Sequence, residues 1–335
     1  MYTICVDAMG GDSSPDVVCE GIARALEADE ELRVLVAGTE ECVTRFCEEH
    51  DRALPLVATE VIEMDEHPAE AVRRKKDSSI VRGLAAVHAG EAQGFFSAGS
   101  TGAIFAAATI GVGRIKGIKR PALATPLPGL RGHRTVMLDL GANADVRPDA
   151  IVQFAQMGAA YAHVALGVEN PRVGLLNNGE EETKGSEMAL AFHEALATSS
   201  VPFAGNAEGT DLLIGNFDVI VCDGFTGNVA LKTLEGTAKY IMGALKENIK
   251  DSPRMQEGAA TLMPALKRVQ ASLSGDEYGG ALLLGVKAPV LIGHGATSAD
   301  AVCAGTLAAA SLVKGRLVER ISASLSKTED GEASA

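Results

Sequence analysis

Residues 218–227 read DVIVCDGFTG, a short apolar run that ends in a glycine-rich turn and precedes a long helical stretch. This order predicts a strand followed directly by a helix. The arrangement recurs in GFFSAGSTG at 94–102 and in PVLIGHGAT at 289–297. A strand that returns through a helix usually lies parallel to its predecessor, so these segments predict an α/β fold.

The same alternation extends over the rest of the chain. Strand-like runs at 3–7, 33–38, 134–141 and 172–177 each precede a helical pattern. No Pro- or Ser-rich linker divides the chain. We therefore expect one unit over residues 1–321, of one or two lobes, built on a mainly parallel sheet with helices on both faces.

Two segments depart from this alternation. Residues 238–274 keep a helical apolar pattern over an unusual length, so we predict a helical projection there, split or kinked at Pro264. Residues 322–335, SASLSKTEDGEASA, are small, polar and unpatterned, and we predict a disordered tail.

Charge and composition exclude several classes of function. The 335 residues carry a formal net charge of −14, which argues against nonspecific nucleic-acid binding because that binding needs many Lys and Arg contacts with phosphate. The first residues lack the regions of a signal peptide, and no apolar run reaches about 18 residues. We expect a protein that stays inside the cell, does not span a membrane and keeps its six scattered cysteines reduced.

Glycine-rich turns follow four of the predicted strands. They are Asp7–Asp12 (DAMGGD), Gly99–Gly102 (GSTG), Gly224–Gly227 (GFTG) and Gly293–Thr297 (GHGAT). Ligands of open parallel sheets bind at the carboxyl ends of strands, where amides at a helix start favour an anion such as phosphate. Ordinary turn and N-cap chemistry explains any one of these turns equally well, but the four together predict a shared cleft.

Familiar catalytic signatures are absent from the sequence. It contains no G-x-x-x-x-G-K-[ST] loop, and the nearest approach to G-x-G-x-x-G, at 111–117, has the wrong spacing and follows a helix. It also lacks H-E-x-x-H, a Cys/His cluster and a G-x-S-x-G elbow. Kinase, ordinary dehydrogenase, metal and acyl-serine chemistry are therefore disfavoured.

Taken together, the motifs resemble those of the phosphate acyltransferase family that begins bacterial phospholipid synthesis. The resemblance runs from residue 2 to about 318. It is carried by VDAMGGD (6–12), RRKKDSS (73–79), SAGSTGA (97–103), GRIKGIKRPALAT (113–125), LDLGAN (138–143), GEEETKGSE (179–187), GNAEGTD (205–211), CDGFTGNVALKTLEG (222–236), EYGGALLLGVKAPV (277–290) and GHG (293–295). The chain departs from the family pattern at Ser100, at Asn178 and after His294.

The resemblance implies a three-layer α/β/α fold related to phosphotransacetylases and to isocitrate and isopropylmalate dehydrogenases. It also implies a homodimer without a bound cofactor. The implied reaction converts a long-chain acyl carrier protein thioester and inorganic phosphate to acyl phosphate. The product would pass to a membrane glycerol-3-phosphate acyltransferase.

This reaction needs little acid–base machinery, because phosphate is already nucleophilic and a thiol with a pKa of about 8.5 leaves readily. It needs a held phosphate, a carbonyl placed about 3 Å away and donors for the oxyanion. Lys184 is our first candidate for the cation, His294 for a proton donor and Asn228 for an oxyanion donor. The alternatives are a solvated lysine that balances its neighbouring glutamates, a histidine bonded within its turn and an ordinary turn asparagine.

The turns supply the remaining candidates. Residues expected to bind phosphate or substrate are Gly10, Gly11, Gly99, Ser100, Thr101, Gly102, Asn143, Gly224, Thr226 and Gly227. Three carboxylates are expected to orient amides or the lysine, since they would repel phosphate: Asp7, Asp12 and Asp223.

Partners require surfaces of suited charge. Acyl carrier protein is acidic, so we expect it to dock on the basic residues Arg73, Arg74, Lys75, Lys76, Arg114, Lys116, Lys119 and Arg120, although such runs are often only solvated. The apolar residues Leu262, Met263, Leu266, Val269 and Leu273 are predicted to form a tip that contacts an anionic membrane, a second subunit or both.

Three other functions compete with this interpretation. A phosphotransacetylase would act on short acyl-CoA, and a scaffold would bind acyl carrier protein without chemistry. A dehydrogenase of the isocitrate type would need metal-binding carboxylates that the sequence does not place.

Overall fold

The computed structural model describes residues 1–250, 252–274 and 278–332. Their strands form one 11-stranded sheet in the order β3-β2-β1-β4-β11-β10-β5-β6-β9-β7-β8. The strands are β1 (Tyr2–Asp7), β2 (Leu32–Gly38), β3 (Ala53–Val57), β4 (Gly94–Ser97), β5 (Ala122–Pro128), β6 (Arg134–Leu138), β7 (Val173–Leu176), β8 (Phe203–Ala207), β9 (Val219–Val221), β10 (Ala281–Leu284) and β11 (Val290–Ile292).

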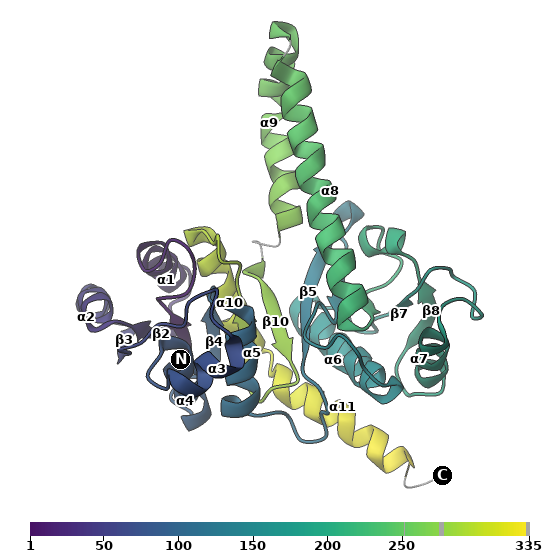
Figure 1. Ribbon diagram of the computed structural model, residues 1–335, viewed down its shortest axis with the longest axis horizontal. Coiled ribbons are helices and arrows are strands. Elements are labelled where there is room, and N and C mark those ends of the chain that lie inside the picture. Colours follow the sequence, from purple (N-terminus) through teal and green to yellow (C-terminus); the bar gives the residue numbers. More distant parts are fainter. Residues whose placement is uncertain (251, 275–277, 333–335) are drawn as a thin grey trace.

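The sheet consists of two parallel blocks that run in opposite directions. In the left block of Figure 1, β3, β2, β1, β4 and β11 are parallel, and in the right block β6, β9, β7 and β8 are parallel. Between them, β10 is antiparallel to both neighbours and β5 is antiparallel to β6. The mainly parallel sheet is confirmed. The two blocks run in opposite directions, but the register Leu291↔Leu282, Leu282↔Ala124 and Ala124↔Leu138 brings the carboxyl ends of β4, β11, β6 and β9 to the same level at the centre of the sheet.

Helices cover both faces of the sheet, which confirms the three-layer α/β/α architecture (Figure 1). One face packs against α1 (Asp16–Ala28), α2 (Glu40–Glu49), α6 (Pro148–Leu166), α7 (Glu187–Ala197), α10 (Ala299–Lys314) and α11 (Leu317–Glu332). The other face packs against α3 (Pro68–Arg74), α4 (Ser79–Ala89), α5 (Thr101–Ala107) and the foot of α8 (Gly224–Lys250). Strand residues such as Phe95, Phe96 and Ile220 are fully buried, which is why the strands read as continuous apolar runs.

A helical hairpin projects from the body of the molecule (Figure 1). Helix α8 leads out and α9 (Pro253–Ser274) returns beside it. Pro264 lies inside α9, so of the two expectations for this proline, a split or a kink, the split is wrong, and the chain instead reverses near Ser252. Beyond the foot of α8, the large apolar side chains that the hairpin exposes are Tyr240, Ile241, Leu245, Met255, Leu262, Met263 and Val269. Leu266 is half-buried, and the side chain of Leu273 lies outside the described residues.

The C-terminal segment differs from the expected disordered tail. Helix α11 continues to Glu332 and contacts α6. Leu317, Ile321 and Leu325 follow one another at helical spacing and are buried, so the predicted disorder is corrected as far as Glu332. Residues 333–335 lie outside the described residues.

Among the described residues, no single helix combines the length and apolar composition needed to cross a membrane. Helices over 299–314 and 317–325, bent by 51°, meet both conditions only as a pair.

Candidate active site in a central pocket

A pocket of about 270 Å³ lies over the centre of the sheet, between its two blocks. Its floor is formed by β5 and β10. One wall comes from the turns after β4 and β11, and the other comes from the first turns of α8. Four of the predicted site residues line this central pocket: Gly99, Thr101, Asn228 and His294.

Asp7 organises the turns of the left wall. Its Oδ1 accepts a hydrogen bond from the Met9 amide (3.0 Å), and its Oδ2 accepts one from the Ser97 hydroxyl (2.6 Å). The same Ser97 oxygen accepts a bond from the Gly99 amide (3.0 Å). A side chain at Gly10 would place its Cβ 2.6 Å from that amide, so the close approach of the two turns requires glycine. Burial raises the pKa of Asp7 even though these donors favour its ionised form.

The turn after β1 is also tied to the turn after β11. The Asp12 amide donates to the Gly295 carbonyl over 2.8 Å. Gly11, the residue before Asp12, has a φ of 104°, a conformation that residues with a side chain rarely adopt. Backbone contacts therefore hold the turns after β1, β4 and β11 together beside the pocket.

Asp139 organises the opposite wall, and sequence reasoning missed it. Its Oδ1 accepts from the Leu123 (3.0 Å) and Ala142 (3.1 Å) amides, and its Oδ2 accepts from the amide (2.7 Å) and side chain (2.9 Å) of Asn143. A Cβ at Gly224 would stand 2.6 Å from the Asn143 carbonyl, so the foot of α8 rests directly on this loop. Burial raises the pKa of Asp139, and the four donors oppose that shift.

Asn143 serves the loop rather than the pocket. It is buried, and its Nδ2 donates to the Pro121 carbonyl (2.8 Å) as well as to Asp139. Asp139 and Asn143 both belong to the strand-like segment LDLGAN (138–143), and its polar residues were the sequence signal for them.

Three polar side chains meet where α8 faces the turn after β11. Glu235 Oε2 lies 2.9 Å from Lys232 Nζ, and Glu235 Oε1 lies 3.9 Å from His294 Nε2. Asn228, Lys232 and Glu235 line the same pocket. Sequence reasoning did not select Lys232 or Glu235, although their i, i+4, i+7 spacing from Asn228 places all three on one side of the helix.

The rest of the central pocket is largely apolar. Its lining includes Leu123, Leu127, Leu140, Leu231, Leu234 and Ile292. A hydrocarbon chain can therefore pack beside the polar cluster of α8 and His294.

Lys184 lies elsewhere. It sits in the loop after β7, half-exposed, with its Nζ 3.9 Å from Glu181 Oε1, and it does not contribute to the described lining of the central pocket. A neighbouring pocket of about 350 Å³ is lined by the loop after β7 together with Asp223 and Thr226, whose amide and hydroxyl both donate to the Asp223 carboxylate over 2.8 Å. Of the predicted residues, Asp223 and Thr226 line this second pocket, whereas Lys184 belongs to the described lining of neither pocket.

The other predicted residues shape these walls. Ser100 is buried where α5 begins, and Gly102 packs closely against Pro68. Gly227, inside the first turn of α8, packs against the backbone of Asp139.

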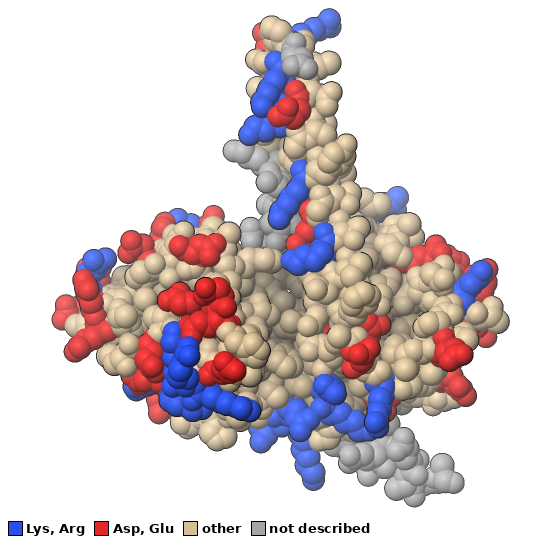
Figure 2. All heavy atoms as spheres, viewed as in Figure 1, with Lys and Arg blue, Asp and Glu red and all other residues tan. Residues whose placement is uncertain are grey.

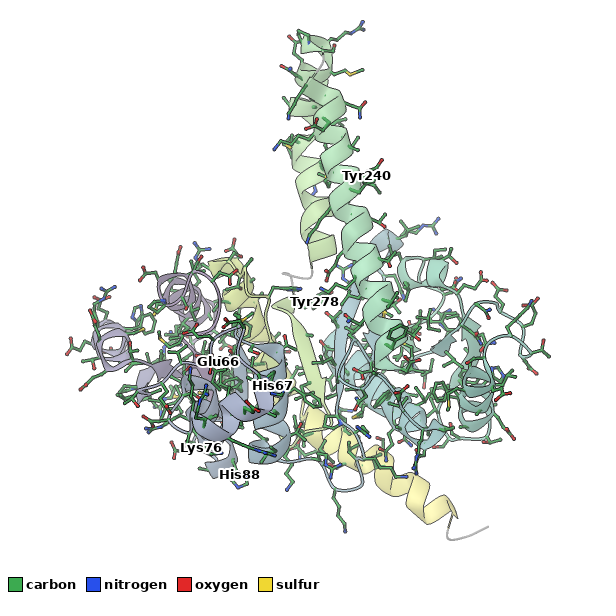
Figure 3. The ribbon with its side chains drawn as sticks, in the orientation of Figure 1. Glu66, His67, Lys76, His88, Tyr240 and Tyr278 are labelled. Atoms are coloured by element: carbon green, nitrogen blue, oxygen red, sulfur yellow. The ribbon has the colours of Figure 1, made fainter. Side chains whose placement is uncertain are left out.

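The predicted docking cations are partly engaged within the chain. Arg74 and Lys75 both pair with Glu66, Lys119 pairs with Asp149, and Arg114 donates to the Lys119 carbonyl. Those with exposed side chains are Arg73, Arg74, Lys76, Arg114, Lys116, Lys119 and Arg120. Figure 2 shows Lys and Arg gathered along the lower edge of this face, away from the hairpin, and Figure 3 places Lys76 there, below Glu66.

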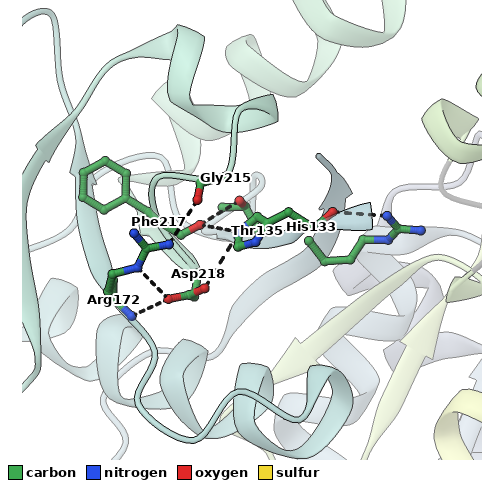
Figure 4. Close-up of polar contacts among 7 residues, drawn as sticks. His133, Thr135, Arg172, Gly215, Phe217 and Asp218 are labelled. Carbon is green, nitrogen blue, oxygen red and sulfur yellow. Dashed lines mark hydrogen bonds and ion pairs between the residues drawn. The ribbon is translucent and has the colours of Figure 1, made fainter. Parts of the chain in front are cut away.

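A separate polar network lies at the amino ends of the right block (Figure 4). Asp218 accepts from the Arg172 amide (2.8 Å) and Nε (3.2 Å), and the Thr135 hydroxyl donates to the Phe217 carbonyl (2.8 Å). None of these residues lines the central pocket as described. The network joins the starts of β6, β7 and β9, so it stabilises the block on which α8 stands.

Comparison with solved structures defines the class of fold. A phosphotransacetylase from Streptococcus pyogenes superposes with a TM-score of 0.60 at 16% identity, covering 93% of this chain and 94% of that one. The EutD phosphotransacetylase from Staphylococcus aureus gives a TM-score of 0.56 at 16% identity with the same coverage. The chain therefore has the fold of the phosphotransacetylases, as expected.

Sequence comparison then gives the family. The model of the family described as fatty acid synthesis protein matches residues 2–320, and this chain belongs to that family. Proteins named phosphate acyltransferase are similar over nearly the whole length. That of Desulfitobacterium hafniense strain Y51 is 45% identical, covering 96% of both chains, and that of Pelotomaculum thermopropionicum is 47% identical, covering 97% of this chain and 96% of its own.

Proposed function

We propose that this chain transfers a long-chain acyl group from acyl carrier protein to inorganic phosphate, giving acyl phosphate for glycerophospholipid synthesis. It is a phosphate acyltransferase, as its family and its named relatives support. The observation that carries the assignment is the central pocket, where a polar cluster from both halves of the molecule adjoins an apolar lining. That combination suits a thioester whose reacting end is polar and whose chain is hydrocarbon.

The chemistry follows from this placement. A phosphate oxygen attacks the carbonyl carbon, the C–S bond breaks, and the sulfur leaves with the bonding electrons as a thiolate. The Asn228 amide is positioned to donate to the developing oxyanion, and His294 is positioned to give a proton to the thiolate. Lys184 lies outside the described lining of the pocket, so it does not contact the reacting atoms in this scheme.

The direct test mixes the purified protein with palmitoyl-acyl carrier protein, with and without inorganic phosphate. Acyl phosphate is trapped with hydroxylamine and identified by mass. We expect hydroxamate that depends on both phosphate and enzyme. Preference for acetyl-CoA would indicate a phosphotransacetylase instead, and binding of the acyl carrier protein without turnover would indicate a scaffold.

We also propose the partners that deliver the substrate of this enzyme and receive its product. The exposed basic residues near α3 and between α5 and β5 would receive the acidic acyl carrier protein, since charge complementarity guides encounter. The product would then pass to a membrane glycerol-3-phosphate acyltransferase, with the enzyme peripherally bound to the inner face of an anionic membrane.

The hairpin is the proposed contact for a second subunit and for the membrane. Its exposed apolar side chains have basic neighbours at the far end, Lys250 and Arg254. Leu262→Glu should lower the dimer fraction measured by light scattering and reduce sedimentation with phosphatidylglycerol vesicles. Gln256→Glu, on the same helix and already exposed and polar, is the matched control. Equal behaviour of the two variants in both assays would remove the hairpin from either role.

A further inference from the structure

Helix α8 contributes the charge of the central pocket. Among the described residues that line it, Lys232 is the only Lys or Arg. A phosphate ion bound here would therefore meet its positive partner at Lys232 or recruit a cation from outside the lining. The ammonium carries three N–H donors, and its 2.9 Å contact with Glu235 uses one of them.

Glu235 connects the two walls of the pocket. One carboxylate oxygen faces Lys232 on α8 in the right half, and the other faces His294 in the turn after β11 in the left half. Its side chain is 21% exposed, whereas those of Lys232 and His294 are 60% and 56% exposed. The most buried member of the cluster thus lies between the two that reach into solvent.

We infer that Lys232 is the phosphate-binding cation of this enzyme and that Glu235 is a positioning residue that holds Lys232 and His294 toward each other across the pocket. The inference rests on the proposed function. In this scheme the role of Lys232 is electrostatic: its ammonium group offsets the charge of phosphate as the new C–O bond forms and the C–S bond breaks. Two N–H donors remain for the phosphate oxygens while the third stays on Glu235.

A binding experiment tests the cation without requiring turnover. Thermal unfolding of the parent protein is compared in phosphate and in chloride of equal ionic strength. We expect phosphate to raise the Tm of the parent, to raise it less for Lys232→Arg and to leave it unchanged for Lys232→Met, because a ligand stabilises only the state that binds it. Lys246→Met is the control, since it lies on the same helix about 21 Å farther along and is exposed. A parent that gains nothing from phosphate, or a Lys232→Met variant that gains as much as the parent, overturns the assignment.

Steady-state kinetics then separate the two roles. Lys232→Met should raise the KM for phosphate at least tenfold while the KM for acyl carrier protein stays within twofold. Glu235→Gln should lower kcat about tenfold while the KM for phosphate changes by less than threefold, since the cation is present but misplaced. If Lys232 and Glu235 only stabilised the fold, both substitutions would reduce the amount of active enzyme. They would not affect the KM for phosphate in one variant and kcat in the other. An unchanged kcat for Glu235→Gln, or a phosphate KM that responds to Lys184→Met and not to Lys232→Met, would refute the inference. A parent that binds phosphate but makes no acyl phosphate would count against the transfer reaction alone.

Discussion

Replacing Asp139 by Asn should destabilise the protein by an amount that its hydrogen bonds determine. The carboxylate accepts two bonds on each oxygen, and the near-isosteric amide retains one acceptor. The two bonds from Asn143 are lost, and the new NH₂ group faces those donors. At about 1.5–3 kcal/mol for each lost bond to a charged acceptor, the free energy of unfolding should fall by about 3–6 kcal/mol. For a chain of 335 residues this corresponds to a Tm lower by about 4–9 °C.

The pH dependence of this loss has a defined sign. Because burial raises the pKa of Asp139 in the folded state above its ordinary value of 3.8, the folded protein binds this proton more tightly than the unfolded chain. The stability that this tighter proton binding contributes is fully present below pH 3.8 and is lost as the pH rises through the folded-state pKa. The loss calculated above refers to the ionised carboxylate, so parent and Asp139→Asn are compared above the folded-state pKa, where this proton-linked contribution is already lost.

Urea unfolding of the parent, Asp139→Asn and Asp145→Asn measures the effect. Asp145 is exposed in the same loop, so its variant should stay within about 0.5 kcal/mol of the parent. Phosphate acyltransferase activity should also fall in Asp139→Asn, since the loop supports the α8 turn that carries Asn228. Equal stability of the two variants would refute the argument that Asp139 anchors this wall.

Two further predictions concern other parts of the body. The hydrogen bond from Lys75 holds the pKa of Glu66 at about 2, so the stability it contributes should be present above pH 4.5 and lost as the pH falls toward 2. Glu66→Gln should flatten that part of the acid denaturation curve, whereas the exposed Glu70→Gln should not, and identical curves would contradict the pairing. Cys5 and Cys222 are buried whereas Cys19, Cys42, Cys47 and Cys303 are partly exposed, so iodoacetamide should label the first two only after unfolding and the other four faster. Peptide mass spectrometry that finds Cys5 or Cys222 labelled in the native protein would contradict this packing.

The sequence was sufficient to predict the fold class because its strands are buried on both faces. Runs such as VIV at 219–221 and FF at 95–96 are apolar without alternation, as a sheet covered by two helical layers requires. It was insufficient to predict the reversal at the centre. Strands β5 and β10 pair antiparallel across more than 150 residues, and nothing local to ALATPLP or ALLL specifies that partner or its direction.

The sequence predicted those site residues whose backbone geometry requires a particular amino acid. It missed the residues whose role depends on tertiary packing. Glycines such as Gly10 and Gly11 mark turns that approach one another closely, so the sequence shows them. Lys232 and Glu235 lie within a helix, where charged residues are usually solvated. Only the packing of α8 opposite the turn after β11 brings Glu235 to His294, residues 59 positions apart.

The reversal of strand direction explains why the pocket lies at the centre of the sheet. Crossover helices connect the parallel strands on either side, whereas β5 and β10 run antiparallel to neighbours, and on the face away from α6 Leu123 and Leu127 line the central pocket. The turns of the left block and the foot of α8 enclose this face from two sides and leave the pocket between them. Its shape therefore depends on how α8 is held, below by the Asp139 loop and laterally by Glu235. Substitutions at these two supports should alter catalysis even though neither carboxylate bonds to the reacting atoms in our scheme.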